Sequence, residues 1–92
     1  MVDQRDVGQW HRKTFPECVP SRLRAKLREE TEEADSEFLA AGYRNGARLR
    51  SEIADVAIVL MAIADRCGFD LQQAIDDKFA RVVEKYAEYV DG

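Results

Sequence analysis

Apolar residues recur at helical spacing along most of the chain, and proline and glycine divide this pattern into segments. The first segment, Asp3 to Phe15, ends at a proline, and the linker Glu17 to Pro20 follows it. The second segment, Ser21 to about Ala41, opens on a residue type that caps helices and stops before Gly42. Both segments are therefore predicted to be helices.

Two further helices are predicted after a loop from Gly42 to Gly46. The third runs from Ala47 to Cys67, with Gly68 as its natural stop. The fourth starts with Asp70 as its N-cap and has Gln73 three residues later, in a capping-box pattern, and it continues to about Val90. Since no segment favours a strand, the sequence predicts an all-α protein of four helices.

The third predicted helix is unusually apolar, because Asp55 is its one polar residue between Ile53 and Ala64. A helix that is apolar on all sides is buried on all sides, and the other helices of so short a chain cannot cover it. We therefore expect a second subunit to pack against this helix. Residues expected to face the chain's own helices are Ile53, Ala57, Leu60 and Ala64; expected partner contacts include Ile58, Val59, Met61 and Ile63.

Size and charge narrow the classes of protein. Residues 1–92 form one domain by length, and the net charge of −4 argues against nucleic acid as the main partner. Cys18 and Cys67 have no metal-binding or redox spacing, so a reducing cytoplasm is the expected location. The first residues lack the apolar run that is typical of a signal peptide, and the longest apolar run, Val56 to Ala64, is shorter than the roughly 20 residues that span a bilayer. No membrane contact is expected.

Two acidic phrases, at residues 29–33 and 52–55, carry the candidate chemistry. Carboxylates three or four residues apart project from one helix face. Glu30 lies at the edge of an apolar stripe, and Asp55 interrupts a buried run, where an isolated charge would be costly. When packed together, the two helices would direct a set of carboxylates at a common point, where a cation would offset their repulsion. The predicted metal ligands are Glu30, Glu33, Glu52 and Asp55.

A purely oxygen-based ligand set suits Mg²⁺, Mn²⁺ or Ca²⁺. The di-iron sites of helical bundles need Glu-x-x-His motifs, and the one histidine here is His11. Bound Mg²⁺ often completes its coordination shell with substrate phosphates. Two alternatives stay open: a solvated charge run, and a salt bridge from Asp55 to Arg48 or Arg50.

The fourth predicted helix adds basic residues. Lys78 lies at the border of its apolar stripe, with Arg81 and Lys85 on the same flank. A lysine at this border can reach a phosphate near the carboxylates. The alternative is that its aliphatic stem packs while the ammonium reaches water.

The full acidic pattern, Glu29-Glu30-x-x-Glu33, an interval of 18 residues and Glu52-x-x-Asp55, resembles the signature of the MazG-like all-α nucleoside triphosphate pyrophosphohydrolases. This resemblance implies a four-helix unit that forms a homodimer or homotetramer through the apolar third helix. It also implies Mg²⁺-dependent cleavage of a nucleoside triphosphate between its α- and β-phosphates, giving a nucleoside monophosphate and pyrophosphate.

By position, the resemblance makes the four carboxylates named above the metal ligands. Glu29 would be a further ligand, or would orient or deprotonate the attacking water, and Lys78 would contact the phosphates. Many relatives have asparagine and arginine where this chain has Val82 and Lys85, so one polar contact is missing and Lys85 takes the arginine position.

Base contacts are expected from Trp10 and His11, since some relatives hold the base between aromatic rings. The alternative is that Trp10 packs over the bundle while His11 is exposed. Two other functions stay open: a phosphoribosyl-ATP pyrophosphohydrolase, and a non-catalytic helical dimerisation module.

Overall fold

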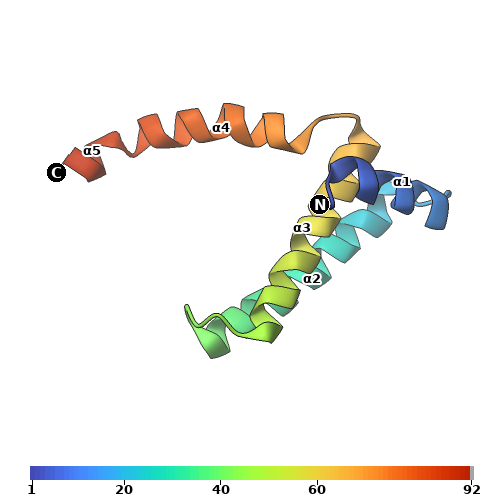
Figure 1. Cartoon of the computed structure of the whole chain (residues 1–92), viewed down its shortest axis with the longest axis horizontal. Helices are drawn as coiled ribbons and strands as arrows, with labels where there is room; N and C mark the ends of the chain where they lie inside the picture. Colours follow the sequence, from blue (N-terminus) through green and yellow to red (C-terminus); the bar gives the residue numbers. More distant parts are fainter. Residues whose placement is uncertain (92) are drawn as a thin grey trace.

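The computed structural model describes residues 1–91, and the side chains of residues 1–89. This part of the chain is all-α, as predicted, and Gly92, the last residue of the predicted domain, lies outside it. The helices are α1 (Gln4–Thr14), α2 (Pro20–Ala41), α3 (Ala47–Cys67), α4 (Leu71–Lys85) and α5 (Ala87–Asp91). Helices α2 and α3 form an antiparallel hairpin, α1 packs on α3, and α4 leaves the hairpin at a corner (Figure 1). Within residues 1–91, no helix combines the length and the apolar character needed to cross a membrane.

Local sequence explains most of the helix ends. A capping box opens α1, because the Asp3 side chain accepts from the backbone N–H of Asp6 and the Asp6 side chain accepts from the backbone N–H of Asp3, both at 3.0 Å. The predicted Ser21 cap is wrong, since α2 begins at Pro20, whose fixed φ suits a first helical position, and Val19 precedes it without a side-chain cap. At the end of α3, Gly68 adopts a φ of 79°, a left-handed conformation that favours glycine.

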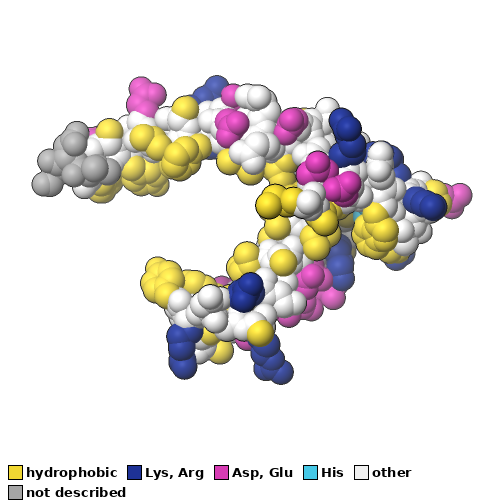
Figure 2. Space-filling model, viewed as in Figure 1, with side chains coloured by type: hydrophobic (Ala, Val, Ile, Leu, Met, Phe, Trp, Pro, Cys, Tyr) yellow, Lys and Arg dark blue, Asp and Glu magenta, His cyan; other side chains and the backbone are white. Residues whose placement is uncertain are grey.

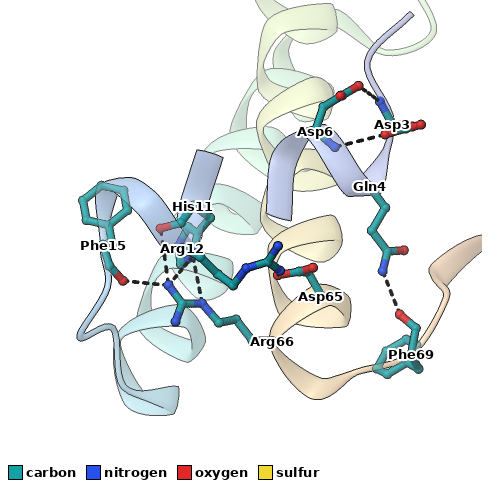
Figure 3. A network of polar contacts seen from close by, with 9 residues as sticks. All are labelled: Asp3, Gln4, Asp6, His11, Arg12, Phe15, Asp65, Arg66 and Phe69. Atoms are coloured by element: carbon teal, nitrogen blue, oxygen red, sulfur yellow. Dashed lines mark hydrogen bonds and ion pairs between the residues drawn. The ribbon is translucent and has the colours of Figure 1, made fainter. Parts of the chain in front are cut away.

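A side chain of α1 holds the corner between α3 and α4. The Gln4 amide donates to the carbonyl of Phe69 and accepts from the backbone N–H of Leu71, both at 2.7 Å (Figure 3 shows the first bond). Asp70 caps α4 as predicted, accepting from the backbone N–H of Gln73 at 3.2 Å. These bonds fix the direction in which α4 leaves the hairpin.

The predicted single helix from Asp70 to Val90 is wrong, because it breaks at Tyr86, where φ is −100° and ψ is 12°. No residue of α4 is buried. Helices of this length owe most of their stability to packing of an apolar face. The far end of α4 therefore lacks the contacts that would hold one continuous helix.

The core is small and lies where α1, α2 and α3 meet. Val7, Leu23, Val59 and Ala62 form it, and the partly buried side chains packed against it are Cys18, Leu27, Met61 and Ile63.

This core corrects the predicted faces of α3. Val59, expected at a partner contact, is 7% exposed, whereas Ile53 and Leu60, expected inside, are 52% and 38% exposed. The reason is that α2 packs on the face of α3 that carries Val59 and Ala62, and α4 does not fold back over the opposite face. Ala64 is fully buried, as predicted.

The chain is more extended than a compact domain of its size. Its radius of gyration is 15.7 Å, against about 12 Å expected for a compact fold of this length. Apolar side chains gather along the inner side of the arch that α4 makes with the hairpin (Figure 2). On α4 the exposed large apolar residues are Ile75, Phe79 and Val83.

Candidate metal and nucleotide site

The α2–α3 hairpin brings three of the predicted metal ligands together. One carboxylate oxygen each of Glu30, Glu52 and Asp55 lies within 4.8 Å of the others. Glu30 is buried, at 5% exposure, and the other two are half-buried. The antiparallel pairing sets the acidic phrase of α2 opposite that of α3, and this places the cluster between the helices.

A second acidic group consists of Glu29, Glu30 and Glu33, whose carboxylate oxygens also approach one another within 4.8 Å, and it shares Glu30 with the first. The negative charge of Glu30 raises the pKa of Glu33, with smaller contributions from burial and from the charge of Glu52. All five acidic residues predicted for the site thus belong to two groups joined at Glu30, whose charges repel one another.

Two carboxylate oxygens in these groups lack partners. Glu30 Oε2 and Glu52 Oε2 are buried and make no hydrogen bond among the described residues. The other oxygen of Glu30 accepts from Lys26 Nζ at 2.9 Å, and this bond, followed by the charges of Glu30 and Glu29, raises the pKa of Lys26. Buried charges need a partner, and one lysine cannot serve three carboxylates. The all-oxygen donor set fits a hard divalent cation such as Mg²⁺.

A pocket adjoins the cluster. Its volume of about 530 Å³ is within the usual range for small-molecule sites. Glu30 and Asp55 line it at one part, and aromatic rings of α1 and the following turn line another. The described residues that line it are Trp10, His11, Phe15, Cys18, Arg22, Leu23, Lys26, Glu30, Asp55, Ile58, Val59 and Ala62. Carboxylates, cations and flat rings in one pocket are a chemical match for a nucleotide bound with a metal ion.

The predicted base-contact residues both line this pocket. The expected alternative, a packed Trp10 with an exposed His11, is wrong: Trp10 is 54% exposed and His11 is 7% exposed. The reason is that α1 turns His11 toward α3. Trp10 instead packs edge-on against Phe15, with ring centroids 5.8 Å apart.

A polar network attaches α1 to the C-terminal end of α3 (Figure 3). Arg66 donates from Nε to His11 Nδ1 at 3.2 Å, and from an Nη to the carbonyl of Phe15 at 2.6 Å. Arg12 forms an ion pair with Asp65. Gly8 lies against this carboxylate so closely that a Cβ at Gly8 would overlap it. These contacts fix the ring-bearing wall of the pocket.

The basic residues near the carboxylates are not those that the sequence suggested. Lys78 and Lys85 lie on exposed positions of α4, and neither lines the pocket within one chain. Arg22 and Lys26 do line it, although the sequence pattern of α2 at these positions is typical of a solvated flank. The spacing of Arg22, Lys26 and Glu30, four residues apart each time, was the available signal, because it places all three on one helix face.

Among proteins of known description, the chain is similar to a protein of Salmonella phage PMBT28 named dATP/dGTP diphosphohydrolase. The two are 35% identical over 78 residues, which is 84% of this chain and 24% of the relative. The chain therefore spans about a quarter of the length of the curated relative it matches. No family model and no solved structure matches the chain.

Proposed function

We propose that the chain is a metal-dependent hydrolase that cleaves nucleoside triphosphates between the α- and β-phosphates, releasing a nucleoside monophosphate and pyrophosphate. The observation that carries this proposal is the pair of unpartnered buried oxygens, Glu30 Oε2 and Glu52 Oε2, beside a pocket with aromatic walls. The relative's name adds support and makes dATP and dGTP the first substrates to test.

Glu30, Glu52 and Asp55 would hold Mg²⁺, or Mn²⁺ as the second choice, with Glu33 beside them. When bound, the metal supplies charge neutralisation at the phosphoryl oxygens and makes a water more acidic. Glu29, at the exposed rim, orients the attacking water or accepts its proton.

The cations lining the pocket, Arg22 and Lys26, contact the phosphates. Lys26 is bonded to one oxygen of Glu30, and its ammonium has further donors that could contact a phosphate. Trp10 and His11 contact the base. Lys78 and Lys85 reach the phosphates only if α4 of a second copy lies over the pocket.

A homodimer or homotetramer is part of this proposal. The apolar residues of α4 are exposed in one chain, and so are Ile53 and Leu60 of α3. A second copy that covers both sets would bury them. The same exposed surface favours the rival function, a non-catalytic helical assembly module, which predicts association without any turnover.

The deciding experiment incubates the protein with dATP, dGTP, the other NTPs and dNTPs, and phosphoribosyl-ATP, with and without Mg²⁺, and measures pyrophosphate. We expect Mg²⁺-dependent release from dATP and dGTP, and its loss in Glu30→Gln. Glu32→Gln is the matched control, because Glu32 is an exposed neighbour on α2 that belongs to neither acidic group. Self-association of the protein without pyrophosphate release from any nucleotide would favour the assembly module. Pyrophosphate release from phosphoribosyl-ATP alone would favour a phosphoribosyl-ATP pyrophosphohydrolase.

A further inference from the structure

The side chain of His11 is held from behind by Arg66. His11 lines the pocket, whereas Arg66 does not. Arg66 places Nε at 3.2 Å and an Nη at 3.1 Å from His11 Nδ1, and the same Nη reaches the carbonyls of His11 and Phe15 at 3.3 and 2.6 Å. The guanidinium is thus tied to α1 at three acceptors, and its position relative to the ring is well fixed (Figure 3).

This contact determines where the proton of the imidazole lies. A guanidinium has donors and no acceptor, so Nδ1 must accept. The neutral ring then carries its proton on Nε2. Burial, followed by the charge of Arg66, lowers the pKa of His11 while Asp65 opposes this, which keeps the ring neutral at physiological pH. The hydrogen bonds of the His11 ring to described residues are made at Nδ1, and Nε2 is not among the buried atoms without a partner, so it is open for a ligand.

We propose that Arg66 is a positioning residue that fixes His11 as a neutral Nε2–H donor, and that this donor binds N7 or N3 of a purine base in the pocket. The inference rests on the function proposed above and deepens it by naming the atom that recognises the base.

The choice of N7 or N3 follows from the chemistry of the two purines. Adenine and guanine both present acceptors at N7 and N3, whereas at position 6 adenine has a donor and guanine an acceptor. A single donor with a fixed proton can serve both bases only through a ring nitrogen that they share. A rotating or titrating group would not impose this restriction.

The test begins with the ¹⁵N spectrum of the imidazole, which needs no assignment because His11 is the one histidine of the chain. We expect an unprotonated Nδ1 and a protonated Nε2 in the wild-type protein. In Arg66→Met the two tautomers should mix. If that variant does not fold, the wild-type spectrum and the variant described next still decide the matter.

The base contact is then measured with the monophosphates, whose binding requires no turnover. dAMP should shift the Nε2 signal, and either 7-deaza-dAMP or 3-deaza-dAMP should bind about 3- to 10-fold more weakly than dAMP, as expected for one neutral hydrogen bond. The penalty should disappear in His11→Phe, which keeps a ring and removes the donor. The same comparison on kcat/KM of the triphosphates should give the same ratio.

A protonated Nδ1 in the wild type would overturn the proposal. So would equal binding of dAMP and both deaza analogues, or a deaza penalty that persists in His11→Phe. A deaza penalty in binding without any hydrolysis would overturn the proposed reaction and leave the base contact supported. Hydrolysis at the same rate for dATP and both deaza analogues would support the reaction and overturn the base contact.

Discussion

The hairpin and helix α4 use apolar residues in opposite ways. With α1, the α2–α3 hairpin encloses a core and holds buried carboxylates beside a pocket. Helix α4 carries Ile75, Phe79 and Val83 at helical spacing and buries none of them. One chain therefore suffices to assemble the acidic cluster and the aromatic wall. It does not suffice to cover α4.

The strongest test of the hairpin removes one charge from its cluster. Glu30→Gln should lower kcat/KM by about 100-fold or more, since phosphoryl transfer is accelerated mainly by positioning and electrostatic stabilisation of the transferring group. It should also abolish the rise in Tm that we expect Mg²⁺ to give the wild type. In metal-free buffer its Tm should be unchanged or higher, because Glu30 repels its neighbours. Loss of activity with a collapsed metal-free Tm would instead assign Glu30 a structural role.

A substitution at the contact between α1 and α3 tests how tightly α1, which carries the aromatic wall of the pocket, packs on the hairpin. Gly8→Ala should cost about 1–3 kcal/mol in the free energy of unfolding, measured in urea, because the new Cβ overlaps the Asp65 carboxylate, which can move aside only by disturbing its ion pair with Arg12. Helix propensity alone would favour alanine by about 1 kcal/mol, so the sign of the change separates the two effects. Gln9→Ala, at an exposed position of the same helix, is the control and should be nearly neutral.

Substitution on α4 tests the other side of the comparison. Phe79→Ser should weaken self-association by about 10-fold in sedimentation equilibrium, because Phe79 is 63% exposed in one chain and would be buried by a second. Arg81→Ser, exposed on the same helix, should leave association nearly unchanged. A monomeric wild type, or equal effects of the two variants, would contradict a partner that covers this stripe.

The smallest expected effect is a pH dependence from His11. Its pKa is lowered in the folded chain, first by burial and then by Arg66, from an ordinary 6.5. Below that value the unfolded chain binds more protons, so stability is lost as the pH falls from about 6.5 toward the lowered value. The Tm of the wild type should therefore fall more steeply over this range than that of His11→Phe, and parallel curves would remove the basis for a buried neutral ring.

The sequence predicted those features that depend on short-range patterns. The bounds of α3, the Gly42 and Gly68 stops and the Asp70 cap are local, and each is confirmed. The convergence of Glu30 with Glu52 and Asp55 also followed from spacing, because two antiparallel helices have few ways to pair their acidic faces.

The rest depended on how the helices pack. Val59 and Leu60 are equally apolar, so the pattern could not say which of them faces α2. The burial of His11 depends on Arg66, 55 residues away, and no local signal links them. Arg22 and Lys26 looked like solvated charges because their role depends on the pocket between helices.

The position of α4 depends on Gln4, a residue of the first helix. One amide near the start of the chain bonds both sides of the turn that begins α4, at Phe69 and Leu71. The turn between α3 and α4 is therefore held in place by a residue of α1. A side chain that can accept but not donate, as in Gln4→Glu, would keep one bond and loosen the other. Such a change would alter the angle between α4 and the hairpin while leaving the exposed apolar residues of α4 unchanged.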